Sequence, residues 1–463
     1  GNVAMAKAQA EPGEALNLVI NPDCSYALQT VDTRDTGQIR WIGNGRTVLN
    51  NKGNPVKQYE PYFSINPFFE DHKALVERGV TPILYYDALG RNIRTELPNG
   101  SFSRVEFDSW RQRSFDPNDT VRYSAWYGER GSPDPQAPEP GDPDTRAAWL
   151  SAKHHDTHAA LHLDTLGRPV FSVEHNRIEQ TDQAGNVTGS TDAFYQTRIV
   201  LDIEGNARAI IDARGNTVMA YGYNMLGARV YQDSMDAGER WTLSNVAGNP
   251  MRARDSRDHT VATTYDILQR PLTMHVRGGD GPAPLDNVFE RIVYGEGSSN
   301  DRADNLRGQV LYHYDTAGRL QNTRFDFKGN LLEGNRRFAV DYRNTVDWQG
   351  NDPDARLEAE TFTQQSEYDA LNRVVRSLTP DGSVTEPGYN AANLLETMRV
   401  TQQENAQLFV TNIDYDEKGQ RRRISYGNGV TTDYAYDPQT FRLLHLETRR
   451  SNGNLLQDLR YVY

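Results

Sequence analysis

The stretch of sequence that decides the fold runs from Tyr86 to Phe107 and reads YDALGRNIRTELPNGSFSRVEF. It opens with a Tyr-Asp-x-x-Gly-Arg unit, continues with alternating polar and apolar residues, and turns again at Pro98, Asn99 and Gly100. Alternation with a period of two is typical of a half-buried strand, and Pro, Asn and Gly between two such runs are typical of a tight turn. The stretch therefore predicts one unit of turn, strand, turn and strand.

This unit recurs along the chain, with a second full copy of the consensus at Tyr314–Arg319. Degenerate copies keep an Asp or Asn at the second position. In the longest run they follow one another at intervals of 18 to 22 residues, at Asp164, Asp182, Asp202, Asn224, Asn245 and Asp266. Further copies lie at Asp108, Asp369, Asn390, Asp416 and Asp437, and we interpret Asp212 and Asp326 as half-period copies.

A repeated hairpin of this size determines the fold class. Because a hairpin of about 20 residues cannot bury a face alone, consecutive hairpins are expected to pair into one continuous sheet. The right-handed twist of strands makes a long sheet curl. The sequence therefore predicts an all-β fold, a long curling antiparallel sheet of these hairpins with short helices and loops as insertions. The 37 Gly and 22 Pro among 463 residues agree, because both interrupt helices.

Each residue type in the consensus has a predicted structural role. The Asp accepts hydrogen bonds from backbone N–H groups, and the Gly adopts positive φ, as Asn can in the copies that carry Asn372 and Asn393, whereas Gln269 departs from the pattern. We expect the Tyr ring to stack on the next repeat with its hydroxyl in water, and the Arg to pair with carboxylates of neighbouring hairpins. The predicted structural turn residues are Tyr86, Asp87, Gly90, Arg91, Asp164, Gly167, Arg168, Tyr314, Asp315, Gly318, Arg319, Tyr368, Asp369, Asn372, Arg373, Tyr415, Asp416 and Gly419.

Composition excludes several classes of protein. The 50 Lys and Arg against 63 Asp and Glu give a net charge of −13, which argues against a nucleic-acid-binding surface along the whole chain. A single cysteine, Cys24, cannot form an internal disulfide, and no base is suggested beside it. No apolar run approaches the ~18 residues of a membrane span, and no signal peptide is visible.

The repeat pattern divides the chain into four segments. Residues 1–44 are unassigned, 45–130 are expected to form the first hairpins, 131–153 a Pro-rich loop and a short helix capped by Asp144, and 154–463 the continuing sheet. Two polar stretches, 277–308 and 333–367, are expected to be loops or irregular hairpins at the edge of the sheet. The sequence stops inside a repeat, so we expect a truncated chain with an unpaired strand edge near Asp458–Tyr463 and an open, curved sheet.

Candidate sites for chemistry are few. His154, His155, His158 and His162 lie within nine residues, and His154, His158 and His162 are weak candidates for a Zn²⁺ or Ni²⁺ site. The alternative is a helix-to-strand junction with solvated histidines. The carboxylates recur at every turn, whereas a catalytic pair should be unique, so we predict no catalytic residues, no cofactor and no enzymatic activity.

The Tyr-Asp-x-x-Gly-Arg unit resembles the YD repeats of the Rhs family, which also occur in teneurins and bacterial toxin complexes. Two further stretches, NNKGNPVKQYEPYFS (50–64) and RAAWLSAKHHDTHAALHLDTLGR (146–168), together with residues 86–121, resemble the C-terminal, shell-forming half of the B component of insecticidal Tc toxin complexes. The resemblance covers roughly residues 45–463.

The resemblance implies a function. It implies a non-enzymatic segment of a hollow β-sheet shell, built jointly with a C component whose toxic C-terminal part is the encapsulated cargo, and docked on a pore-forming A component. It also implies a secreted or extracellular complex, with no nucleic acid and no direct membrane insertion by this chain. The alternative is a cell-surface YD-repeat module for adhesion or carbohydrate binding.

Overall fold

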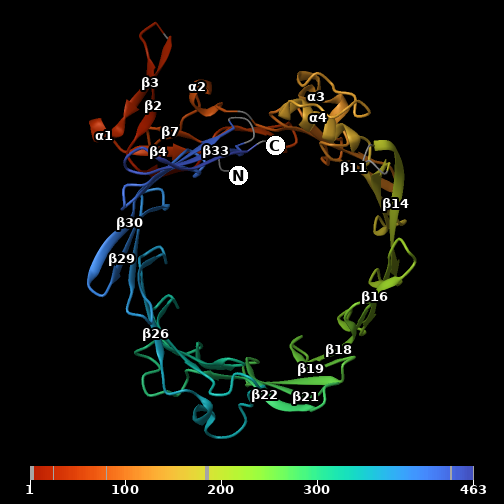
Figure 1. Ribbon diagram of the computed structural model, residues 1–463, viewed down its shortest axis with the longest axis vertical. Helices are drawn as coiled ribbons and strands as arrows, with labels where there is room; N and C mark the ends of the chain where they lie inside the picture. Colours follow the sequence, from red (N-terminus) through yellow and green to blue (C-terminus); the bar gives the residue numbers. More distant parts are fainter. Residues whose placement is uncertain (1–4, 24, 80, 183–186, 438–440, 462–463) are drawn as a thin grey trace. The chain divides into compact units, whose positions relative to one another are not determined.

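The computed structural model describes residues 5–23, 25–79, 81–182, 187–437 and 441–461 (Figure 1). Strands make up 50% of the chain and helices 7%, which confirms the predicted all-β class. Within the described residues, 27 strands form one antiparallel sheet in which neighbours in sequence are neighbours in space. Cys24, the cysteine singled out in the sequence, lies outside the described residues.

A separate small sheet precedes the repeats. Its five strands lie in the order β1 (Lys7–Ala10), β4 (Arg40–Gly43), β7 (Tyr62–Ser64), β2 (Glu14–Ile20) and β3 (Tyr26–Asp32), beside a two-stranded ladder of β5 (Thr47–Leu49) and β6 (Pro55–Gln58) and the short helices α1 (Thr33–Thr36) and α2 (Lys73–Val76). Tyr62, Leu75 and Val76 form its buried core against Leu16 and Leu18. The expected start of the repeat hairpins at residue 45 is therefore wrong. Residues 45–82 contain no Tyr-Asp sequence, and three of their apolar side chains, those of Tyr62, Leu75 and Val76, belong to the core of the small sheet instead.

The repeat sheet is divided between two compact units. The first comprises residues 1–197, 388–398 and 408–463, and the second 198–387 and 399–407. Strands of the repeat sheet that lie wholly or mostly in the first unit are β8 (Ile83–Tyr86), β9 (Asn92–Glu96), β10 (Phe102–Phe107), β11 (Arg111–Phe115), β12 (Ala159–Leu163), β13 (Pro169–Thr181), β14 (Val187–Leu201), β30 (Asn405–Tyr415), β31 (Arg421–Tyr426), β32 (Thr431–Tyr436), β33 (Leu443–Arg449) and β34 (Leu455–Arg460).

The remaining strands lie wholly or partly in the second unit. They are β15 (Ala207–Ile211), β16 (Thr217–Tyr223), β17 (Arg229–Ser234), β18 (Gly238–Ser244), β19 (Pro250–Asp255), β20 (His259–Tyr265), β21 (Pro271–Gly278), β22 (Leu285–Tyr294), β23 (Val310–Asp315), β24 (Gly318–Phe325), β25 (Leu331–Phe338), β26 (Phe362–Tyr368), β27 (Val374–Leu378), β28 (Val384–Tyr389) and β29 (Leu395–Gln402). The stretch 277–308, expected to be loops or irregular hairpins, contains the strand β22 between two loops, and β22 pairs with β21 through a register shift.

The C-terminal strand has neighbours on both sides. In the hydrogen-bonded order of the first unit, β34 stands between β33 and β8. The expected unpaired strand edge at Asp458 is therefore wrong for the described residues, because β8, far away in sequence, occupies that side. The described structure therefore does not support the expected self-association through an unpaired C-terminal strand.

Two insertions carry most of the irregular structure. Between β11 and β12 lie a 3₁₀ turn (Val121–Tyr123), α3 (Ala125–Glu129) and α4 (Pro143–Lys153), which share a core of buried side chains (Figure 1). Helix α4 begins two residues earlier than expected, because the Asp142 carboxylate accepts from the Thr145 N–H at 2.8 Å and Pro143 occupies the first turn. Between β25 and β26, a loop with a 3₁₀ turn (Pro353–Arg356) brings the fully buried Trp348 against Tyr314.

Because each strand runs antiparallel to the one before it, successive turns alternate between the two ends of the strands. We call each of the two resulting rows of turns an edge of the sheet. In the second unit, one edge carries the turns that begin at Asp202, Asn224, Asn245, Asp266, Asp326 and Asp369, and we call it the Asp edge. The opposite edge carries the turns at Asp212, Met235 and Asp315. The turn at Asp326, which we interpreted as a half-period copy, therefore lies on the same edge as the main run of copies. The turn of the second full consensus copy, at Asp315, lies on the opposite edge.

Candidate functional site

The Tyr-Asp turns are the repeated site of this chain, and Asp87 shows their standard geometry. One carboxylate oxygen of Asp87 accepts from the backbone N–H groups of Leu89 and Arg91, each at 2.9 Å. The backbone closes the turn through Gly90 N–H to the Asp87 carbonyl at 3.0 Å, with Gly90 at φ 83°. These bonds stabilise the charged carboxylate, led by that from the Arg91 backbone, and hold the pKa of Asp87 below its ordinary value.

The same arrangement recurs wherever the turn closes a standard hairpin. Backbone N–H groups two and four residues on bond to the side chain of Asp164, Asp202, Asp212, Asn224, Asn245, Asp266, Asp326, Asp369 and Asp416. The Gly position has positive φ at Gly167 and Gly419, and also at Asn372 and Asn393, as predicted. Gln269, the departure, adopts φ 63° as well. At these positions the side-chain bonds and the positive φ are those of one common turn.

The motif arginines pair within their own turn. Arg91, Arg168 and Arg373 each donate Nε to the Asp of the same turn at 2.7 Å. Arg91 and Arg168 thus bond to the Asp four residues earlier and not, as expected, to carboxylates of neighbouring hairpins, whereas Arg319 does pair with Asp354 of another loop. The guanidinium of Arg91 also makes a cation–π contact, because it lies 4.0 Å from the centre of the Phe107 ring, just before the next Asp turn.

The motif tyrosines tie each repeat to the one before it. The Tyr265 hydroxyl donates to the carbonyl of Pro250 at 2.7 Å, and Tyr415 donates to Leu395 at 2.5 Å. Each acceptor follows the preceding turn at the same position, five residues after its Asp or Asn. The expectation that these hydroxyls stay in water is therefore wrong. The signal that the sequence offered was the fixed place of the acceptor, the fifth residue after the Asp or Asn of the previous repeat.

The second full consensus copy, at Tyr314–Arg319, departs from this geometry. Asp315 pairs directly with Gly318 in a two-residue turn, and Gly318 has φ 145°. Arg319 is buried and bonds to Asp354 of the β25–β26 insertion, and the Tyr314 hydroxyl donates to the same carboxylate at 2.9 Å. Burial, with Asp354 adding to it, raises the pKa of Tyr314 to about 12.

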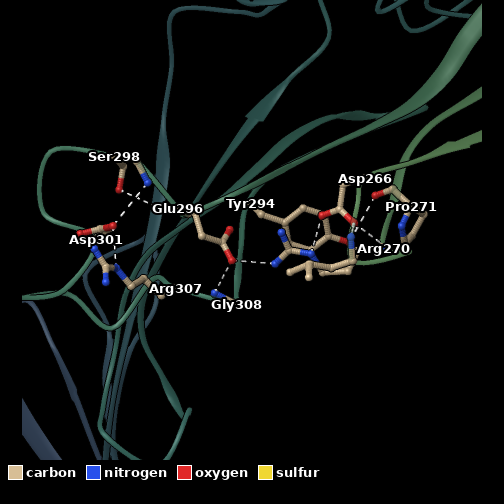
Figure 2. Close-up of polar contacts among 12 residues, drawn as sticks. Asp266, Arg270, Pro271, Tyr294, Glu296, Ser298, Asp301, Arg307 and Gly308 are labelled. Atoms are coloured by element: carbon tan, nitrogen blue, oxygen red, sulfur yellow. Dashed lines mark hydrogen bonds and ion pairs between the residues drawn. The ribbon is translucent and has the colours of Figure 1, made fainter.

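The loop between β22 and β23 is fastened to an Asp-edge turn, as Figure 2 shows. Arg270 donates to Asp266 at 2.7 Å and to Glu296 at 2.8 Å, and its guanidinium lies 3.9 Å from the centre of the Tyr294 ring. Glu296 also accepts from the Gly308 N–H at 2.9 Å (Figure 2). Three groups thus fix one guanidinium, which leaves it little freedom to bind a ligand.

The described part of the chain contains hollows large enough to hold a small molecule. One of about 590 Å³ lies beside Arg270 and Trp348, and one of about 950 Å³ lies beside α4. In the larger hollow, Lys153 is paired with Glu179 at 2.6 Å and Arg177 with Asp192 at 2.8 Å. These two cations are therefore already neutralised by neighbouring carboxylates.

The histidine cluster does not assemble a metal site. His158 stacks on Phe115 with ring centres 4.4 Å apart, and His162 meets Phe171 edge-on at 5.5 Å. His154 ends α4 and is exposed. The one group of three metal-ligating side chains in the described part of the chain is His445, Glu447 and Asp458, where Glu447 is held by two bonds from Arg449.

The hairpins closed by these turns agree with the expected resemblance to YD-repeat proteins, and the chain is also similar to individual known proteins. The chain is 28% identical over 334 residues to toxin subunit YenC2 of Yersinia entomophaga, covering 65% of this chain and 33% of that protein. Toxin subunit YenC1 of the same organism is 26% identical over 332 residues, covering 68% of this chain and 33% of that protein. The chain thus spans about one third of the length of these curated relatives. No family model matches the sequence.

Solved structures match the whole chain. The structure of TcdB2-TccC3 without its hypervariable C-terminal region superposes with a TM-score of 0.83 at 25% identity, covering 100% of this chain and 21% of that one. The Photorhabdus luminescens Tc holotoxin pore matches with the same TM-score at 24% identity, also covering 21% of the solved chain. The expected resemblance to Tc toxin complexes is confirmed.

Proposed function

We propose that this chain is a structural segment of the shell of a bacterial toxin delivery complex. The observation that carries the proposal is the match of the entire chain, at a TM-score of 0.83, to a stretch of TcdB2-TccC3. The similarity to two toxin subunits supports the same conclusion and favours a shell over a cell-surface adhesion module.

The chemistry of the turns supports a non-enzymatic role. Apart from Asp315, the carboxylates at the predicted turn positions accept backbone hydrogen bonds two and four residues on, so they serve the sheet and are not available as a convergent acid and base pair. The network around Asp315 and Arg319 has the same character, because each of the two is neutralised by a partner from another strand or loop. A catalytic acid or base must be able to contact a substrate, whereas these carboxylates and guanidinium groups are hydrogen-bonded to other groups of the chain.

The partners follow from the proposal. A C component would complete the shell and supply the encapsulated toxin, and a pore-forming A component would receive it, outside the producing cell. In the described residues no helix is long and apolar enough to cross a membrane, which agrees with leaving translocation to another subunit.

Encapsulation provides the test. The protein that contains this chain would be co-expressed with a C component carrying β-lactamase as its C-terminal cargo, purified, and treated with trypsin. We expect a stable complex in which the β-lactamase segment resists digestion while the same fusion alone is degraded. Equal digestion rates in the two samples would overturn the shell assignment.

A further inference from the structure

The larger hollow, in the first unit, lies where an insertion meets a hairpin of the sheet. Its walls are the end of α4, the Pro-rich loop at residues 135–139, and the hairpin of β13 and β14. Its volume of about 950 Å³ is at the upper end of the roughly 300–1,000 Å³ typical of small-molecule sites. The hollow is therefore large enough for a small organic molecule and too small for a folded partner.

Contacts that need no ligand hold these walls in place. The Trp149 indole N–H donates to the Ala137 carbonyl at 3.0 Å, which fastens the loop to α4. Arg177 donates to the His155 carbonyl at 2.9 Å and to Asp192 at 2.8 Å, which fastens the hairpin to the end of the same helix. The cavity is thus already formed, and a ligand that enters it does not have to order the chain.

One guanidinium of the lining, that of Arg122, has no carboxylate partner in the described chain. Arg122 is exposed and lies in the 3₁₀ turn whose Val121 is buried in the core of the insertion. The carboxylates that line the hollow are paired with other cations, Glu139 with Arg146, Glu179 with Lys153 and Asp192 with Arg177. The hollow therefore carries one positive charge that the described residues do not neutralise.

The charge of Arg122 also acts on His155, another residue of the lining. Burial is the main cause that lowers the pKa of His155, and the positive charge of Arg122 is the next. Arg177 acts in the same direction, whereas the Ala152 carbonyl and Asp156 oppose it. The electrostatic potential at this end of the hollow is thus positive, which favours a bound anion.

The lining also indicates which kind of anion fits. A guanidinium binds the oxygens of a carboxylate or a phosphate through two parallel N–H groups. Pro135 and Pro138 add an apolar wall, and the exposed Ser190 hydroxyl, which has no partner in the described chain, is a further donor. The net charge of −13 argues against nucleic acid. We propose that this hollow binds a small organic anion, with its carboxylate or phosphate at Arg122 and its carbon skeleton against Pro135 and Pro138.

Binding of matched benzene derivatives to the full chain tests the site. Isothermal titration calorimetry at low ionic strength compares benzoate and phenyl phosphate, which carry the two head groups, with neutral benzamide. We expect at least one of the anions to bind with a Kd of about 0.1–1 mM, and benzamide to bind at least about tenfold more weakly. The tighter anion identifies the head group. Benzamide that binds as tightly as both anions, or no binding of either anion at about 10 mM, would overturn the proposal.

Two variants show whether Arg122 is the group that binds. Arg122→Gln should weaken binding of the anion at least about tenfold, because it removes the charged donor. The control Arg302→Gln removes the same charge from an exposed arginine of the second unit and should bind as the wild type does. Both variants should keep the wild-type melting temperature, so weaker binding is not confused with unfolding. Equal affinity of the two variants for the anion contradicts the proposal.

The pKa of His155 is an independent readout. In an NMR titration of histidine-labelled protein, assigned with the variant His155→Gln, the bound anion should raise the pKa of His155 because it neutralises the charge of Arg122. Arg122→Gln should raise it without any ligand. A pKa of His155 that does not change at saturating anion would place the ligand elsewhere and refute the site. These assays contain neither a C component nor cargo, so their failure is distinct from failure of the shell assignment.

Discussion

Arg336 holds Asp315 through two hydrogen bonds, each 2.7 Å long, from a strand that the repeat consensus does not predict as a partner. The consensus pairs Asp with the Arg four residues later, as in Asp87 and Arg91. At Asp315 that Arg turns instead toward Asp354. The same six letters therefore adopt two geometries, and the difference at Asp315 coincides with its partners Arg336 and Asp354, because Asp212 keeps the standard turn on the same edge.

The two consensus glycines should respond differently to substitution. A Cβ at Gly90 would meet only the Asn54 side chain, at 3.3 Å, whereas a Cβ at Gly318 would lie 2.1 Å from the Arg337 carbonyl. Gly90→Asn should cost less than about 1 kcal/mol, because Asn372 already adopts this conformation. Gly318→Asn should cost about 2–4 kcal/mol, because the β25 backbone must move. Urea unfolding of both variants measures the difference, and equal midpoints would contradict it.

The tyrosine hydroxyls should contribute to stability. Tyr265→Phe removes the bond to Pro250 and leaves that carbonyl without its donor, at an expected cost of about 0.5–1.5 kcal/mol. Tyr195→Phe is the matched control, since in the described chain the Tyr195 hydroxyl has no protein partner. Chemical denaturation compares the two. A Tyr265→Phe variant as stable as the control would show that the hydroxyl is solvated.

Acid should weaken the turns. Hydrogen bonds from Asn216, its backbone N–H first, lower the pKa of Asp212 from its ordinary value near 3.8. A lowered folded-state pKa means that the carboxylate's contribution to stability is complete above the unfolded pKa and is lost as pH falls through the folded pKa. Asp212→Asn keeps the backbone bonds, as Asn224 does in its own turn, and removes the titrating group. In this variant the free energy of unfolding should therefore decrease less steeply as the pH falls below about 4.

Denaturation curves from pH 6 to pH 2 check this expectation. Asp236→Asn serves as the control, because in the described residues the Asp236 carboxylate accepts no hydrogen bond. A slope that is unchanged in Asp212→Asn relative to this control would contradict the role of the turn carboxylate.

Metal removal should have no effect on stability. His158 and His162 each contact a different aromatic ring, Phe115 and Phe171, and do not converge. A chelator should leave the melting temperature unchanged, and purified protein should contain no stoichiometric zinc or nickel. Bound metal that is lost in the variant His158→Gln, His162→Gln would contradict this prediction.

Local chemistry made most of the fold predictable. The Asp and Gly positions act within five residues, so Asp87, Gly90 and their degenerate copies indicated both the turns and the hairpins between them. The small N-terminal sheet was missed because its contacts, such as Tyr62 with Leu75 and Leu16, follow no repeat.

Long-range partners account for the remaining differences. Arg336, Asp354 and Trp348 meet Tyr314 and Asp315 across insertions of no fixed length, so their separations in sequence carried no signal. The position of β8 beside β34 was hidden for the same reason. The tyrosine hydrogen bonds were also predictable, because the acceptors Pro250 and Leu395 each lie five residues after the Asn of the preceding turn.

The alternation of the two sheet edges restricts how such a chain can change length. Adding or deleting one whole hairpin leaves every later turn on its original side, whereas adding or deleting a single strand moves all later turns across the sheet. Insertions inside a turn avoid the problem, and the two largest are those between β11 and β12 and between β25 and β26, the second of which lies on the side opposite the Asp edge. Duplication in steps of two strands is therefore the route by which this architecture can lengthen without losing the identity of either side.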